Sequence, residues 1–173
     1  MTNPVMQEID AQPVAATLTK ADGRWVLTMV RDLPHPVERV WPKLTEPDQL
    51  ATWSPIGPDR PLTTVGPATA RETADQSPVD AEVLVSDPPR ELVHRWGSHQ
   101  LRWRLSPTPA GTRLTLEQTF DVETEAPMYG AGWHICLAVL AVRLAGHDVD
   151  RVVGAQANDF GWETLRERYA AAV

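Results

Sequence analysis

Three polar side chains that can do chemistry stand among apolar residues in the second half of the chain. His94, His99 and Gln118 lie in segments whose polarity alternates from one residue to the next, as in strands. An imidazole can bind a ligand or carry a proton near neutral pH. Because an unpaired buried polar group costs about 1–3 kcal/mol, these side chains need partners in the protein, in water or in a ligand.

Two interpretations of His94 and Gln118 stay open. Either they orient a ligand in an otherwise apolar pocket, or His94 is a core histidine bonded to Gln118 or to the backbone. His99 lies next to a turn and is expected at the solvated rim. His134 either points into the mouth of the cavity or caps a neighbouring loop. The residues expected to contact a ligand are His94, Trp96, Leu101, Trp103, Gln118 and Phe120, with Trp53, Trp133 and His134 from other elements.

Catalytic and metal-binding patterns are missing from the sequence. There is no G-x-S-x-G elbow, Walker loop, G-x-G-x-x-G after a strand or H-E-x-x-H. His134 and Cys136 are two residues apart, so they face different sides of a helix. Cys136 is expected to be a small buried side chain. His147, Asp148 and Asp150 are expected to lie in a solvated loop rather than to form a metal site. We therefore assign no catalytic residue and no metal or cofactor.

The elements that must position these side chains form an antiparallel meander. Gly97-Ser98 separates two alternating segments and predicts a two-residue hairpin turn. The turn pairs Trp96 with His99 and His94 with Leu101, which places apolar side chains on one face and charged ones on the other. The expected inner face also includes Ala81, Val83, Val85, Leu92, Trp103, Leu105, Leu114, Leu116, Gln118 and Phe120.

A long apolar helix is expected from Ala131 to Gly146. Trp133, Leu137 and Leu140 recur at helical spacing, and the flanking rows are apolar too. The segment is shorter than the roughly 20 apolar residues that cross a bilayer, so we expect no membrane span. A helix that is apolar nearly all round must be covered on most sides. The inner face of the sheet is the expected cover; a second copy of the chain could also supply it, which leaves a homodimer open.

The rest of the chain divides into a lead-in, short elements and an extension. Residues 1–13 are expected to be a flexible lead-in, 14–146 the main domain and 147–173 an extension with an amphipathic helix packed on it. Two short helices are expected after the first strands, one opening at Pro36 and one over 46–53 with Thr45 as its cap. The last helix carries a stripe of Trp162, Leu165 and Tyr169, with Asn158 or Asp159 as its cap. Trp162 is thereby assigned to packing.

Composition limits the class of protein. The 173 residues are 42% hydrophobic and 23% charged, as in ordinary globular chains. A net charge of −7 argues against a nucleic-acid partner. A single cysteine and an N-terminus without the basic-then-apolar pattern of a signal peptide favour a cytoplasmic location.

Two segments resemble a known superfamily. Asp32 to Trp41, with its Asp-Leu-Pro and Val-x-x-Val-Trp pattern, and Gly132-Trp133 at the opening of the long helix are similar to START-like (SRPBCC), helix-grip proteins. The branch is the one named after the activator of the heat-shock-protein-90 ATPase, in its bacterial single-domain form. The resemblance implies an α+β helix-grip fold, in which a curved antiparallel sheet wraps a long C-terminal helix with two short helices between the first strands. It also implies a cavity between sheet and helix that takes an apolar small molecule.

Three functions follow as hypotheses. The first is binding of an apolar or aromatic small molecule in that cavity, without catalysis. The second is a chaperone-regulating or other protein-interaction module, as the namesake of the branch implies. The third is an enzyme like the polyketide cyclases and hydrolases of this architecture, which is disfavoured because the sequence offers no acid–base pair beyond His94 and His134.

Overall fold

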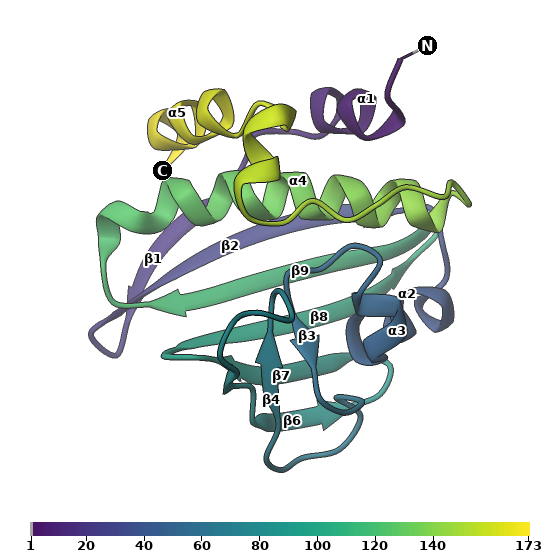
Figure 1. The fold of residues 1–173 in the computed structure, drawn as a ribbon, viewed down its shortest axis with the longest axis vertical. Helices are drawn as coiled ribbons and strands as arrows, with labels where there is room; N and C mark the ends of the chain where they lie inside the picture. The colour runs from purple at the N-terminus through teal and green to yellow at the C-terminus, as the bar shows by residue number, and fades with distance from the viewer. Residues whose placement is uncertain (1) are drawn as a thin grey trace.

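The computed structural model describes residues 2–173, and strands of alternating polarity build its main layer (Figure 1). Six antiparallel strands form one twisted sheet. In spatial order they are β1 (Thr17–Ala21), β2 (Arg24–Leu33), β9 (Gly111–Phe120), β8 (His99–Thr108), β7 (Glu91–Trp96) and β6 (Val83–Asp87). A second, small sheet contains β3 (Gly57–Pro58), β4 (Thr69–Arg71) and β5 (Val79–Asp80).

Helices and 3-10 turns occupy the connections and both ends of the described chain. The helices are α1 (Pro4–Ala11), α2 (Val37–Thr45), α3 (Pro47–Leu50), α4 (Ala126–Leu144) and α5 (Trp162–Ala172). The 3-10 turns are η1 (Glu123–Glu125) and η2 (Gly154–Phe160). The α+β class, the antiparallel sheet, the long helix and the two short helices after β2 are as the sequence predicts.

The register of the meander is confirmed. Trp96 pairs with His99, His94 with Leu101, and Leu101 with Gln118. Gly97 has φ +61°, which a hairpin turn of two residues favours and most side chains resist. The opposite face carries ion pairs: Arg102 bonds Glu91 at 2.7 Å. The register thus places the residues predicted for the two faces of β7, β8 and β9 as expected, although Val93 on the charged face is buried.

The expected position of Val85 on the inner face is wrong. Val83 is fully buried, whereas Val85 is 38% exposed. The register of β6 against β7 shifts between Val83 and Val85, which is a β-bulge. An extra residue in one strand reverses the faces of the residues that follow it, and alternation alone gives no sign of where the shift occurs.

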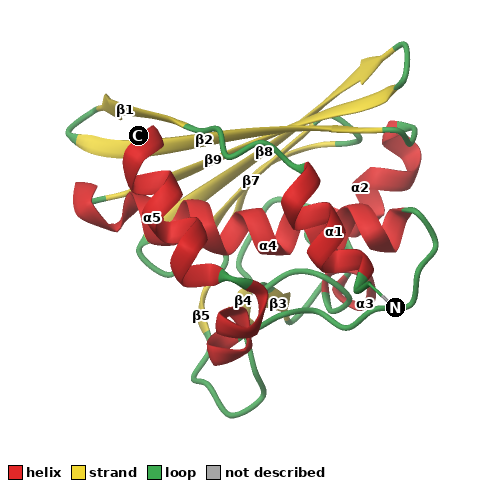
Figure 2. Ribbon diagram, turned by 90° about the horizontal axis from the view of Figure 1, so that it is seen from above, coloured by secondary structure: helices red, strands yellow, loops and turns green. Residues whose placement is uncertain are grey.

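Helix α4 lies between two layers. Its one side packs on the inner face of the sheet, and α1 and α5 lie across its other side (Figures 1 and 2). The span Glu123–Leu144 is long and apolar enough to cross a membrane by composition, but 67% of its most apolar window is buried inside the protein. Both layers are needed to explain why the helix is apolar nearly all round.

The segment expected to be a flexible lead-in contains helix α1. Asn3 caps it, accepting a hydrogen bond from the Val5 N–H at 2.9 Å, and Pro4 occupies its first turn. Val5 and Ile9, four residues apart, are buried. Because the segment is short and polar and buries only these two residues, its helical periodicity is too weak to predict the helix from the sequence.

Two predicted caps are also wrong. The hydroxyl of Thr45 donates to the Trp41 carbonyl of its own helix, and Glu46 occupies the cap position of α3. Helix α5 begins after Gly161, at φ +79°, rather than after Asn158 or Asp159, which belong to η2. A left-handed glycine joins η2 to α5 and sets the angle between them.

Candidate functional site

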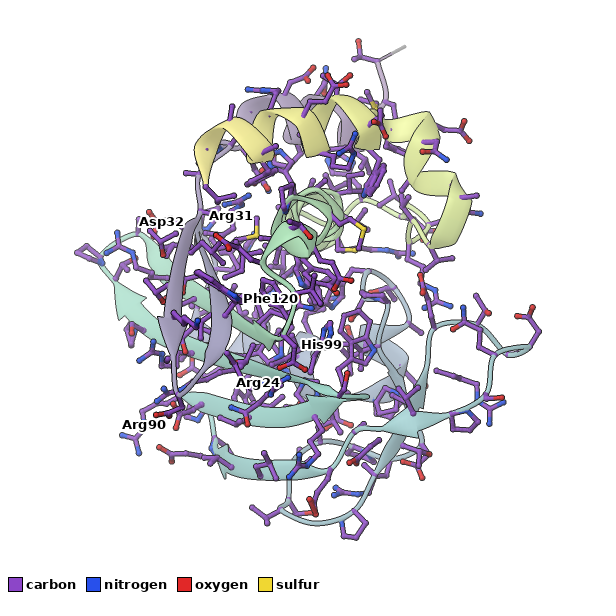
Figure 3. All side chains as sticks on the ribbon, turned by 90° about the vertical axis from the view of Figure 1, so that its left-hand side faces the viewer. Arg24, Arg31, Asp32, Arg90, His99 and Phe120 are labelled. Carbon is purple, nitrogen blue, oxygen red and sulfur yellow. The ribbon has the colours of Figure 1, made fainter. Side chains whose placement is uncertain are left out.

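The sheet-facing side of α4 is filled by aromatic side chains. Trp103 is buried and packs edge-on against Trp53, at 5.9 Å between ring centroids, and against Trp133, at 5.4 Å. Leu101 and Phe120 are fully buried too, and Figure 3 shows Phe120 between the sheet and α4. The side chains expected to line a cavity between sheet and helix therefore occupy that space themselves.

His94 is a core histidine with both ring nitrogens bonded. Its Nε2 accepts from the Trp103 indole N–H at 3.1 Å, and its Nδ1 lies 3.0 Å from the Arg95 carbonyl oxygen. The Nδ1–H therefore donates to Arg95 and the ring is neutral. Burial lowers the pKa of His94 to about 4. A histidine that stays neutral and has no free nitrogen is a poor acid–base group at neutral pH.

Gln118 connects α4 to the rim of the sheet. Its Oε1 accepts from the Trp133 indole N–H at 2.7 Å, and its Nε2 lies 2.9 Å from Nδ1 of His99. His99 is half-buried, and partial burial lowers its pKa. Gln118 is buried with both ends of its amide bonded, so it fixes the indole of Trp133.

His134 lies on a different side of α4, beneath α1 and α5. Its Nδ1 is 2.8 Å from the Tyr169 hydroxyl and its Nε2 is 2.8 Å from the Ile9 carbonyl oxygen. The buried guanidinium of Arg31 donates to Gln12 of the segment after α1 and reaches the Tyr169 hydroxyl at 3.4 Å. Figure 3 shows Arg31 beside α4. This polar network joins both ends of the chain to α4 and β2.

The structure contains a pocket of about 390 Å³ at the edge of α4, beneath η2 and the start of α5. Pockets that bind small molecules have about this size. Its floor comes from α4 and from Trp96 at the end of β7, and its roof from residues after α4. Most of its wall is apolar; the main contributors are Trp96, Trp133, Ile135, Cys136, Val152 and Trp162.

The polar groups of the pocket are few. Glu72 is the one charged side chain among the lining residues; its Oε1 accepts from the Gly154 N–H at 3.1 Å. Tyr129 donates its hydroxyl to Glu125 at 2.6 Å. Burial, with a smaller contribution from the charge of Glu72, raises the pKa of the Cys136 thiol to about 12. The thiol is protonated at neutral pH and is not a nucleophile.

Two of the nine predicted site residues line this pocket. Trp96 and Trp133 do, with ring centroids 5.8 Å apart. The others lie in the packed core or in the network of His134. Whether any of them contacts a ligand stays a prediction. They are His94, Leu101, Trp103, Gln118, Phe120, Trp53 and His134.

The sequence interpretation missed the roof of the pocket. Trp162 is half-buried and lines the pocket, although it was assigned to packing alone. The available signal was the long helix itself, since an all-round apolar surface demands a second cover besides the sheet. Among residues 2–173, no group of three or more His, Cys, Asp or Glu side chains is arranged to hold a metal ion.

A twisted antiparallel sheet that holds a long helix, with short helices after its first strands, defines the START-like class of α+β proteins. Residues 34–145 match the family model described as "Activator of Hsp90 ATPase homolog 1-like protein", and the chain belongs to this family. The matched region includes α2, most of the sheet and α4, but not α1, η2 or α5.

Several solved structures share the fold. CalU16 from Micromonospora echinospora is 22% identical with a TM-score of 0.69, covering 91% of this chain and 95% of CalU16. The conserved protein EF2215 from Enterococcus faecalis is 15% identical with a TM-score of 0.73, covering 98% and 96%. DynU16, from the dynemicin biosynthetic locus, is 26% identical with a TM-score of 0.64, covering 73% of this chain and 50% of DynU16. No curated protein matches the sequence.

Proposed function

We propose that the protein binds an apolar or aromatic small molecule, without chemical change, in the pocket between α4 and the C-terminal extension. The observation that carries the proposal is a ligand-sized pocket whose wall holds three indole rings, those of Trp96, Trp133 and Trp162. Burying an aromatic ligand against them gains roughly 25 cal/mol per Å² of apolar surface.

The chemistry of the pocket supports binding rather than catalysis. Its thiol is held protonated, and neither buried histidine lines it. The indole of Trp133 is fixed by Gln118, so this part of the wall is ordered before a ligand arrives. DynU16, which shares the fold, comes from a biosynthetic locus, where binding of small molecules has an obvious use.

The experiment combines detection of a retained molecule with a graded block of the pocket. Native mass spectrometry of the purified chain should show a bound small molecule, or a panel of uncharged aromatic compounds should shift the indole N–H resonances of Trp96 and Trp133. Gly132 lines the pocket, and an added Cβ there meets no atom within 4 Å. Gly132→Leu should therefore weaken binding at least ten-fold, because its side chain enters the pocket.

Gly132→Ala is the matched control. It makes the same change in backbone freedom but adds one carbon, so binding should stay within three-fold of wild type. Unfolding in urea should show that both variants fold, since Leu and Ala favour a helix over Gly. Equal binding by wild type and Gly132→Leu would contradict the proposed site.

A further inference from the structure

We infer that the ligand carries a cationic ammonium group on its apolar body, held between the aromatic wall of the pocket and the carboxylate of Glu72. This inference rests on the proposed function and specifies its class of ligand. The face of an aromatic ring carries partial negative charge, and rings of Trp and Tyr that surround a site bind quaternary ammonium groups.

The aromatic wall is the first observation. Trp96, Trp133, Trp162 and Tyr129 all line the same pocket. The rings of Trp96 and Trp133 meet at an interplanar angle of 54°, so they present two differently inclined surfaces to one space. The hydroxyl of Tyr129 donates to the carboxylate of Glu125, and a phenol in such a bond is polarised toward negative charge.

The sign of the charge is the second observation. Among the lining residues Glu72 is charged, and none is Lys or Arg. Arg151 lies nearby, but its guanidinium donates to the main-chain carbonyls of Ser54 at 3.0 Å and Glu72 at 2.6 Å. Burial first, and then the charge of Glu72, raise the pKa of the Cys136 thiol in the wall of the pocket, whereas Arg151 lowers it by less. Arg166 lies over the Trp162 ring, 6.0 Å from its centroid, but is paired with Glu163. The charge among the lining residues is therefore that of Glu72, which favours a cation over a carboxylate or phosphate ligand.

Two probes of equal shape test the inference on the full chain. (4-Hydroxybenzyl)trimethylammonium carries a quaternary nitrogen where 4-neopentylphenol has a carbon, so the pair differs in charge alone. The wild-type protein should bind the ammonium probe at least ten-fold more tightly, as measured by calorimetry and by indole N–H shifts. The preference should shrink as NaCl is raised from 20 to 500 mM, because salt screens the partly exposed carboxylate.

Glu72→Gln should reduce the preference to three-fold or less and change the affinity for 4-neopentylphenol less than two-fold. Its amide oxygen can still accept from the Gly154 N–H, so the local structure is kept. Glu123→Gln, an exposed change on η1 outside the pocket, is the matched control and should leave the preference intact.

Equal affinity of the wild type for the two probes would overturn the inference, as would an unchanged preference in Glu72→Gln. Either result would leave the proposed function standing if 4-neopentylphenol binds and Gly132→Leu blocks it. If neither probe binds at 5 mM, the inference is wrong, and the retained-molecule and panel experiments decide the proposed function separately.

Discussion

The two sides of α4 are built differently. Toward the sheet, Trp103, Trp53 and Phe120 are fully enclosed, and the buried polar side chains accept hydrogen bonds from indole N–H groups. Toward the termini, the cover is made of short helices and turns, and it leaves a pocket of about 390 Å³ at one end. Four of the six strands on the sheet side, β6 to β9, fall within the region that matches the family model, whereas the roof of the pocket lies outside it. Stability is thus expected to depend mainly on the sheet side of α4, and binding on the pocket at its edge, with Trp133 shared by both.

Replacing a tryptophan by alanine on each side of α4 should give the largest difference in stability. Trp103→Ala removes a buried ring with two aromatic contacts and leaves Nε2 of His94 unpaired. It should lower the free energy of unfolding by about 3–5 kcal/mol. Trp162→Ala removes a half-buried ring and should cost about 1 kcal/mol. Urea unfolding followed by circular dichroism measures both, and equal losses would erase the distinction between the two sides.

Acid should destabilise the sheet side through His94. The pKa of His94 is about 4 in the fold, whereas an unfolded histidine titrates near 6.5. Between these values the unfolded chain binds a proton that the folded chain refuses, so stability is full above about pH 6.5 and falls toward pH 4. The loss from this one group is about 3 kcal/mol.

His94→Gln isolates that contribution. Its amide oxygen can still accept from Trp103 but does not titrate. Unfolding free energies measured in urea at pH 7 and pH 4 should differ by about 3 kcal/mol less in the variant than in the wild type. The lowered pKa of His134 acts in the same direction but is present in both proteins, so it cancels. The same pH dependence in both would show that His94 is not the titrating group.

The smallest expected changes in stability test how α5 packs on α4. A Cβ on Gly130 would lie 2.9 Å from the ring of Tyr169, so Gly130→Ala must displace α5. We expect a net loss of about 1 kcal/mol, because overpacking exceeds the gain in helix propensity. Gly132→Ala, two residues on, meets nothing and should gain up to about 1 kcal/mol. Opposite signs in urea unfolding would confirm that α5 is seated on Gly130; a gain in both would contradict it.

The sequence predicts the sheet side of α4 better than it predicts the pocket. Period-two alternation around Gly97-Ser98 predicts the register of β7, β8 and β9, because a shift by one residue would bury the charged face. The bulge at Val85 is not predictable from alternation, since it is a local break in that same period. The partners of His94 were only partly predicted: a backbone carbonyl, as expected, but Trp103 in place of Gln118.

The pocket escapes prediction for a physical reason. Its wall combines residues from β7, from α4 and from η2 and α5, which are brought together by the loop after α4. That loop has no apolar period to fix its course. Trp162 satisfies a helical stripe with Leu165 and Tyr169, so its second contact, with the pocket, leaves no mark on the sequence pattern.

The roof of the pocket lies outside the region that the family model matches. Val152, Asn158 and Trp162 all follow α4 in the chain. Replacing that tail could reshape the cavity while the tryptophan-rich interior beneath stays untouched. Proteins that share this scaffold could therefore diverge in what they capture much faster than in how they fold.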